Sequence, residues 1–391
     1  MSTQSASIDA AALTQAAYAA LSKGEAAQAR DLLDQVVSAD RADASVWLAL
    51  AHARGVLGDD AGRGAAIDRA LSLEPNDLRA LIAKGDHMAG AGDMRGASAF
   101  YAAALQYMPR FKSLPPHLQE GLRRAQAANQ QLVRELEDFV RGKLGENGVG
   151  AESAPPRFRS AVDILFGKKR AYVQEPRYLY YPELPQIQFY EHNAFPWLGD
   201  VEDATAEICT ELRAVIGSEF KPYVTQAAGR PQQSQAGLAG SSDWSAYFLF
   251  KDGAEQTGAS KCPRTLAALE AAPLTRIPKR SPSILFSKLA AGAHIPPHTG
   301  MLNARLIVHL PLIVPPGCEF RVGNDVRAWK EGQAWVFDDT IEHEAWNRSS
   351  EDRYILIFDI WRPELSEEER ASIAALCQAI DAYRGNVSWD A

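Results

Sequence analysis

Two histidines stand where metal chemistry could occur. His298 lies in "PPHTG", where one predicted strand begins, and His343 lies in "FDDTIEHEAW", 45 residues later, where another begins. In a β-barrel two such positions can converge at one mouth, where imidazole nitrogens suit a first-row metal such as Fe(II). Histidines this far apart are also common as core or capping residues, so the pair alone leaves both interpretations open.

Short runs of aromatic and β-branched residues surround these histidines. The predicted strands cover residues 244–250, 283–289, 304–314, 318–323, 333–339 and 353–361. Residues 315–318 ("PPGC") and 323–332 ("GNDVRAWKEG") are predicted as turns between them. Strands this short and closely spaced favour a jelly roll or cupin-like barrel, a double-stranded β-helix.

Two predicted helices flank the barrel. One covers residues 203–220 and the other covers residues 366–384. Ser366 is the expected N-cap of the second helix, with Glu369 three residues later completing a capping box.

The first 110 residues repeat with a period of 34. Gly24, Gly58 and Gly92 keep this spacing. The same spacing relates Pro75 to Pro109, Trp47 to Leu81, and the small residues Val36, Ala70 and Ala104. This pattern resembles the tetratricopeptide repeat (TPR), in which stacked helix pairs form a solenoid. Arg63 and Arg41 depart from it, so an alanine-rich helical bundle remains an alternative.

The predicted domain order follows from these patterns. A helix at 116–143, with leucine and valine at helical spacing, is expected to cap the repeats. Residues 145–156 are rich in Gly, Ser and Pro and are interpreted as a linker. We therefore expect a multidomain α and β protein: a TPR-like helical domain at 1–144 and a barrel domain with flanking helices at 157–391.

Composition limits the partners. The chain has 391 residues, enough for two domains, and its net charge of −8 is spread along the sequence. This argues against nucleic acid or an anionic membrane as the main partner. Its four cysteines form no CxxC pair, and no apolar run approaches the roughly 20 residues of a membrane helix. We expect a cytoplasmic protein that binds no membrane; its oligomeric state stays open.

The motifs around the histidines resemble one family. From about residue 189 to 365, "DWS", "PHTG", "HLPL", "FDD", "EHEAWN" and "WRPEL" follow the order and spacing of the aspartyl/asparaginyl β-hydroxylases, which are 2-oxoglutarate oxygenases. The resemblance implies that His298 and His343 hold Fe(II) without the carboxylate of the usual facial triad. Gly300 stands where that carboxylate would be.

The resemblance also assigns the co-substrate residues. Arg353 would grip the distal carboxylate of 2-oxoglutarate, a task that suits a bidentate guanidinium, and Ser287 would share it. His309 would lie near the other carboxylate, and Trp244 would line the pocket. Taken singly, a surface arginine and a core tryptophan would explain such residues; together at the family spacing they favour the site.

Three further polar residues near the motifs receive simpler interpretations. His294 is expected to make a structural hydrogen bond and to be no ligand. Asp338 and Asp339 are expected to stabilise the turn before His343 by accepting from nearby backbone amides. A contact from either carboxylate to that histidine stays open.

The implied reaction is hydroxylation of an unactivated C–H bond with O2 and 2-oxoglutarate, giving succinate and CO2. The substrate would be an Asp/Asn-like residue of a peptide or protein, or a related amino-acid-type molecule. Arg305 matches one substrate-binding arginine of the family, but Ile307 and Ala239 replace two others. Because both cations are missing, we expect a target other than the secreted modules of the best-known members.

Two other functions stay open at this point. The TPR-like repeats, which would recruit a peptide, protein or small-molecule substrate, could instead be the whole function, with the barrel as a catalytically silent scaffold. The barrel could also host a metal-dependent hydrolase or isomerase. Neither needs an arginine and serine clamp for a diacid.

Overall fold

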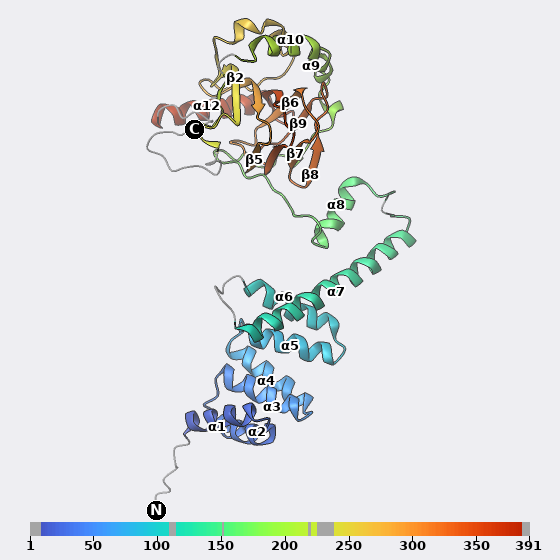
Figure 1. Ribbon diagram of the computed structural model, residues 1–391, viewed down its shortest axis with the longest axis vertical. Helices are drawn as coiled ribbons and strands as arrows, with labels where there is room; N and C mark the ends of the chain where they lie inside the picture. The colour runs from blue at the N-terminus through green and yellow to red at the C-terminus, as the bar shows by residue number, and fades with distance from the viewer. Residues whose placement is uncertain (1–8, 109–114, 151, 218–219, 225–237, 385–391) are drawn as a thin grey trace, which may run out of the picture. The chain divides into compact units, whose positions relative to one another are not determined.

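The computed structural model describes residues 9–108, 115–150, 152–217, 220–224 and 238–384 (Figure 1). The chain divides into two compact units, Met1–Phe166 and Gly167–Ala391. The segment interpreted as a linker, 145–156, spans the end of one helix and the start of the next inside the first unit. The domain boundaries inferred from the sequence therefore stay a prediction.

The first unit is a series of helix pairs (Figure 1). Its helices are α1 (Ala10–Ser22), α2 (Ala26–Ser38), α3 (Ala44–Val56), α4 (Asp60–Leu73), α5 (Leu78–Gly90), α6 (Met94–Tyr107), α7 (Pro116–Glu146) and α8 (Pro156–Leu165). Successive helices from α1 to α7 pack against one another. The expected TPR-like solenoid and its capping helix are confirmed, whereas α8 was not expected from the sequence.

The turns inside the pairs explain the repeating glycines. Gly24, Gly58 and Gly92 have φ angles of +79°, +76° and +81°, and each lies between the two helices of one pair. A side chain there would meet no neighbour, so the left-handed backbone alone favours glycine. The helix after each turn then begins within two residues.

Helix starts and pair contacts follow from short side chains. Five of the six paired helices begin after an aspartate whose carboxylate accepts from a backbone amide of the first turn. The small residues Val36, Ala70 and Ala104 are completely buried between helices, as their spacing predicts. The irregular Arg63 is accommodated by Gly55, where a Cβ would lie 3.0 Å from the arginine stem.

The second unit is built on two antiparallel sheets. Its strands are β1 (Lys221–Pro222), β2 (Trp244–Lys251), β3 (Ala254–Glu255), β4 (Ile284–Leu289), β5 (His294–His298), β6 (Arg305–Ile313), β7 (Cys318–Val322), β8 (Asp325–Ala328), β9 (Trp335–Phe337), β10 (His343–Asn347) and β11 (Arg353–Trp361). One sheet has the order β1-β2-β4-β11-β6-β9, with β3 beside β2, and the other has the order β5-β10-β7-β8.

The pairing of the last eight strands is that of a jelly roll. β4 pairs with β11, β5 with β10, β6 with β9 and β7 with β8, so the first strand meets the last and the pairing continues inward. The expected double-stranded β-helix is confirmed. The prediction that residues 323–332 form only a turn is wrong, because the alternating "DVRA" pairs with β7 as β8.

Helices cover the outer face of the larger sheet. These include α9 (Leu198–Asp203), α10 (Thr205–Val215) and α11 (Pro263–Ala268), with short 3-10 helices at His192–Ala194 and Ala259–Lys261. The helix predicted at 203–220 is present as α10 but is shorter, because it begins at Thr205 and ends at Val215, before Gly217 at φ +91°. The last helix, α12 (Glu367–Arg384), has the expected capping box, with Glu369 N donating to Ser366 Oγ at 3.2 Å.

Side chains that alternate along a strand face two different regions: the core between the larger sheet and its helices, and the space between the two sheets. On β6, Leu306, Val308 and Leu310 pack with α9 and α10, so Ile307 and His309 face the space between the sheets.

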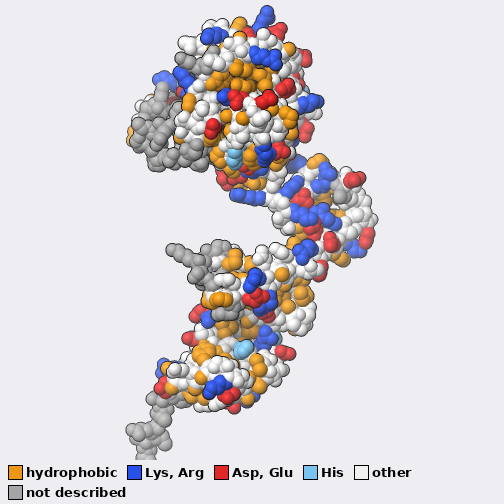
Figure 2. All heavy atoms as spheres, in the orientation of Figure 1, with side chains coloured by type: hydrophobic (Ala, Val, Ile, Leu, Met, Phe, Trp, Pro, Cys, Tyr) orange, Lys and Arg blue, Asp and Glu red, His pale blue; other side chains and the backbone are white. Residues whose placement is uncertain are grey.

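Charged side chains of both signs are interspersed over the face seen in Figure 2. No helix in the described part of the chain has the length and apolar character needed to span a membrane.

Candidate active site

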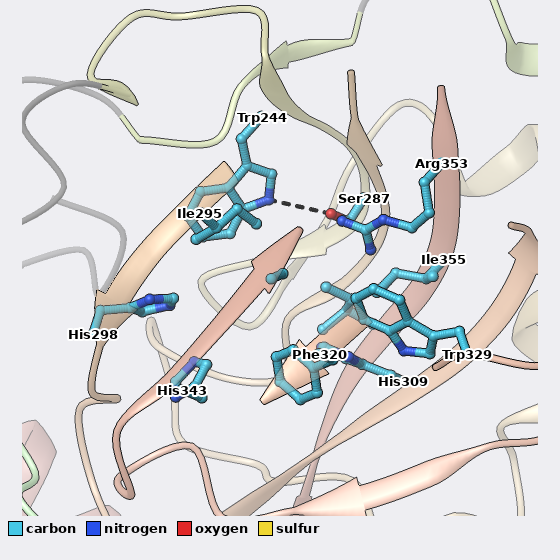
Figure 3. Close-up of a pocket in the computed structure, with 12 residues that line it drawn as sticks. Trp244, Ser287, Ile295, His298, His309, Phe320, Trp329, His343, Arg353 and Ile355 are labelled. Carbon is cyan, nitrogen blue, oxygen red and sulfur yellow. Dashed lines mark hydrogen bonds between the residues drawn. The ribbon is translucent and has the colours of Figure 1, made fainter. Parts of the chain in front are cut away.

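The two histidines of the motifs meet. His298 ends β5, His343 begins β10, and the two residues are directly paired in the sheet, with ring centres 4.1 Å apart (Figure 3). Nδ1 of His298 lies 2.8 Å from the carbonyl oxygen of Pro296, and Nδ1 of His343 lies 3.1 Å from that of Ile341. A carbonyl only accepts, so Nδ1 carries the proton and each Nε2 keeps a lone pair.

Both imidazoles are held neutral. Burial lowers the pKa of His343 to about 4. Burial, and then the neighbouring His343, lowers the pKa of His298 well below its usual value. Neutral rings with a free Nε2 are the form in which histidine binds a metal, so the pair fits a first-row ion such as iron.

Gly300, two residues after His298, cannot be replaced by a residue that supplies a third metal ligand. A Cβ on Gly300 would lie 2.1 Å from Oδ2 of Asp339, so a side chain at this position would collide with that carboxylate. Within the described residues, no group of three or more His, Cys, Asp or Glu side chains is arranged to hold a metal ion. The two imidazoles are therefore the side chains of the described residues that could ligate a metal ion here.

A buried cation lies across a pocket from the two imidazoles (Figure 3). Arg353, the first residue of β11, is 1% exposed, and its guanidinium carbon lies 4.8 Å from the ring centre of Trp329. Its Nε has no hydrogen-bond partner among the described residues. Burial lowers the pKa of Arg353 to about 10, so the group is still charged at neutral pH. A buried charge of this kind is costly unless an anion meets it.

Two more polar groups lie beside this cation. Trp244 Nε1 donates to Ser287 Oγ at 3.2 Å, which leaves the hydroxyl proton of the fully buried serine for another acceptor (Figure 3). His309 on β6 is 7% exposed, and its Nδ1 has no partner among the described residues. Burial, and then the charge of Arg353, lowers the pKa of His309 well below its usual value.

These residues line one pocket. Its walls are Trp244, Ser287, Ile295, His298, His309, Phe320, Trp329, His343, Ala345, Arg353, Ile355 and Ile357. In Figure 3 the histidine pair lies on one side and Arg353 with Ser287 on the other. Six of the seven site residues predicted from the sequence are thus brought together.

The seventh, Arg305, is not among the residues that line this pocket. Its guanidinium pairs with Asp339 at 3.3 Å and with Asp359 at 3.4 Å, both buried. Its role in substrate binding stays a prediction.

The other polar residues behave as structural groups. Asp338 accepts from the backbone amide of Thr340 at 3.0 Å, as expected for a turn, and also pairs with Arg362 at 2.5 Å. His294 lies 3.0 Å from Glu344 and stacks on Trp346, which confirms the structural hydrogen bond expected for it.

Sequence reasoning did not single out Trp329, which lines the pocket, or Arg177, whose backbone contacts the turn after His298. Trp329 lies just after β8, in the segment predicted as a turn, and the "DVRA" alternation before it was the available signal. Arg177 comes from the segment before the barrel, and its backbone amide donates to the carbonyl oxygen of Gly300 at 3.0 Å. No motif links it to the histidines, so the sequence held no signal for it.

A jelly roll whose pocket joins a neutral imidazole pair to a buried arginine defines the class of protein. The model of the aspartyl/asparaginyl beta-hydroxylase family matches residues 202–363. The ornithine lipid ester-linked acyl 2-hydroxylase of Rhizobium tropici is 32% identical over 56% of this chain and 76% of that protein. The chain belongs to the aspartyl/asparaginyl β-hydroxylase family.

Two further similarities concern parts of the chain. The human aspartyl/asparaginyl beta-hydroxylase is 35% identical over 47% of this chain, and the match spans 25% of that protein's length. The solved TPR domain of Sgt2 from Aspergillus fumigatus is 19% identical, with a TM-score of 0.29, over 33% of this chain and 83% of that one. The assignment of the repeats rests on the helix pairs described above.

Proposed function

We propose that this chain is an Fe(II)- and 2-oxoglutarate-dependent dioxygenase that hydroxylates a C–H bond. The observation that carries the proposal is the buried, charged Arg353 facing the same pocket as the neutral pair His298 and His343. A dicarboxylic co-substrate fits this pocket, because one carboxylate would pair with Arg353 and the rest of the molecule would extend toward the two imidazoles.

The residues of the chain have separate tasks in this proposal. His298 and His343 would hold iron through Nε2, since each Nδ1 is occupied by a backbone carbonyl. Iron, when bound, supplies the oxidising chemistry that couples O2 and 2-oxoglutarate to C–H hydroxylation, with succinate and CO2 as co-products.

The opposite end of the pocket would bind the co-substrate. Arg353 and the hydroxyl of Ser287 bind its distal carboxylate, and a ring N–H of the neutral His309 donates to its other carboxylate. The apolar walls formed by Ile295, Phe320 and Ile355 exclude water from the reacting groups.

The names of two relatives suggest a chemical class of substrate. One is called an aspartyl/asparaginyl beta-hydroxylase and the other an acyl 2-hydroxylase. In both names the carbon that receives oxygen is bonded to a carbonyl carbon. We propose that this chain hydroxylates a carbon in the same relation to a carbonyl group, in an Asp/Asn-like residue of a peptide or protein or a related amino-acid-type molecule.

The helical repeats would recruit that substrate. Tyr18 on α1 and Val56 on α3, in successive helix pairs, are 43% and 61% exposed and offer apolar contacts to a peptide. The alternative, a TPR scaffold with a silent barrel, accounts less well for the pocket. In a scaffold that binds no anion in this pocket, the buried charge of Arg353 would only lower stability.

The test is direct. Full-length protein with Fe(II) and O2 is incubated with 2-oxoglutarate and lysate fractions; succinate is measured, and mass spectrometry seeks peptides or metabolites heavier by one oxygen. We expect succinate formation that requires both Fe(II) and 2-oxoglutarate. If 2-oxoglutarate neither binds nor is converted to succinate, the proposal is wrong.

A further inference from the structure

Three buried nitrogen atoms of the pocket have no hydrogen-bond partner among the described residues. They are Nε of Arg353, Nδ1 of His309 and Nε1 of Trp329, and each atom is closed to solvent. All three residues line the same pocket. The proposed function assigns Arg353 and His309 to the co-substrate, but it leaves the indole N–H of Trp329 without a task.

The indole N–H of Trp329 can act only as a hydrogen-bond donor. Its side chain is buried, so water does not reach the nitrogen. A buried donor without an acceptor costs free energy, so a tryptophan at this position lowers stability unless a ligand supplies the acceptor. A phenylalanine would provide an aromatic ring without this cost, as Phe320 does beside it.

Neighbouring rings fix the orientation of the indole. Phe320 stacks on Trp329 with ring centres 5.4 Å apart and an angle of 21° between the planes, and Trp335 stacks at 5.8 Å and 16°. Trp329 directly follows β8, whose pairing with β7 holds its backbone. The N–H is therefore a preorganised donor, which can bind an acceptor with little further loss of side-chain freedom.

Trp329 lies beside two groups that the proposed function already assigns to the co-substrate. The guanidinium carbon of Arg353 is 4.8 Å from the ring centre of Trp329, and the ring centre of His309 is 6.2 Å away. Figure 3 shows Trp329 and His309 next to each other on the wall of the pocket. A cation and nitrogen donors that line one cavity suit an anion with several acceptor oxygens, which a carboxylate provides.

We propose that the indole N–H of Trp329 donates a hydrogen bond to a carboxylate oxygen of the co-substrate, beside His309. This inference rests on the proposed function, because it takes a dicarboxylate as a ligand of the pocket. Trp329 then has two tasks in binding: its ring contacts the guanidinium of Arg353, and its N–H contacts the anion.

The first test observes the indole N–H itself. The chain has eight tryptophans, and NMR of full-length protein with isotopically labelled tryptophan records their indole N–H signals. The protein is loaded with diamagnetic Zn(II), and spectra are compared before and after addition of 2-oxoglutarate. We expect the Trp329 signal to move downfield, as a hydrogen bond to a carboxylate requires, and the Trp335 signal to move less.

Variants assign these signals and measure affinity. Trp329→Phe and Trp335→Phe each remove one signal; if Trp329→Phe does not fold, Trp329→Tyr gives the assignment. The dissociation constant of 2-oxoglutarate is then measured by calorimetry with Mn(II) under anaerobic conditions. In Trp329→Phe it should rise about tenfold, because a hydrogen bond to a charged group is lost.

Trp335→Phe is the matched control for affinity. It makes the same chemical change in a ring that stacks on Trp329 but does not line the pocket. We expect its dissociation constant for 2-oxoglutarate to equal that of the wild-type chain. Equal losses of affinity in the two variants would show that packing and not the N–H is responsible, and would overturn the role of Trp329.

The outcomes separate the two proposals. Absence of 2-oxoglutarate binding to the wild-type chain overturns the proposed function and this inference with it. If 2-oxoglutarate binds but the Trp329 signal stays in place or moves upfield, or if Trp329→Phe binds 2-oxoglutarate as tightly as the wild-type chain, only the role of Trp329 is overturned.

Discussion

Arg353 illustrates how one residue can define a ligand. Its guanidinium is 1% exposed, lies against Trp329 and faces a pocket that also holds the Ser287 hydroxyl. Desolvation lowers its pKa to about 10 without removing the charge at neutral pH. The folded protein therefore keeps a cation in an environment that favours binding of an anion.

Removing this cation should abolish tight co-substrate binding. In Arg353→Gln we expect the dissociation constant of 2-oxoglutarate, measured by calorimetry with Mn(II), to rise about 100-fold, because a desolvated charge pair is lost. In Arg353→Lys the dissociation constant of 2-oxoglutarate should lie between those of the wild-type chain and Arg353→Gln, since an ammonium keeps the charge but not the planar shape of the guanidinium. Arg348→Gln, at an exposed ion pair with Glu319, is the control and should change nothing. A change under threefold in Arg353→Gln would contradict the assignment.

His309 should make stability depend on pH. Its pKa is lowered well below 6.5 by burial, so the folded protein stays unprotonated where the unfolded chain binds a proton. The contribution to stability is therefore present above pH 6.5 and is lost as the pH falls below it. Between pH 7.5 and 5.5, urea unfolding of the apoprotein should show a loss about 1 kcal/mol larger for the wild-type chain than for His309→Phe. Equal losses would show that His309 is protonated in the folded state.

At the scale of elements, the spacing of glycines in the repeats has a conformational cause. Gly58 and Gly90 both have open space where a Cβ would lie, but only Gly58 has a positive φ, +76°. Gly58 joins α3 to α4, whereas Gly90 is the last residue of α5. The two positions therefore separate backbone strain from packing.

Alanine at these two positions should act in opposite directions. Gly58→Ala should lower the free energy of unfolding by about 1 kcal/mol, because an L-residue is strained in the left-handed region. Gly90→Ala should raise it by up to about 1 kcal/mol, because alanine favours the helix. Urea denaturation followed by circular dichroism measures both changes. Destabilisation by both substitutions would mean that packing, and not φ, decides these sites.

At the scale of the whole molecule, the two compact units have separate cores. The buried clusters of the helix pairs contain no residue of the sheets, and the clusters between the sheets contain none of the repeats. The residues that line the pocket all lie in Gly167–Ala391. A ligand of the pocket should therefore stabilise that unit selectively.

Calorimetry of the intact chain tests this independence. We expect two unfolding transitions, and Mn(II) with 2-oxoglutarate at 100 times its dissociation constant should stabilise one of them by about 2.7 kcal/mol while leaving the other unchanged. Removal of the metal with a chelator should reverse the shift. A single transition that moves as a whole would show that the two units unfold together.

The sequence by itself determined the parts that depend on local periodicity. The 34-residue repeat predicted the helix pairs, and short aromatic and β-branched runs between turn residues predicted six of the strands, because both signals depend on neighbours along the chain. The resemblance to a family supplied the roles of His298, His343 and Arg353, and the structure brings these three residues to one pocket.

Only the tertiary structure decided which distant segments meet. It showed that "DVRA" is a strand because β7 lies beside it, and that Asp339 occupies the space beside Gly300. It also brought Arg177 to the turns that carry the histidines, through hydrogen bonds between residues more than a hundred positions apart. Such contacts leave no periodic signal, because they depend on the path of the whole chain and not on any residue's neighbours in sequence.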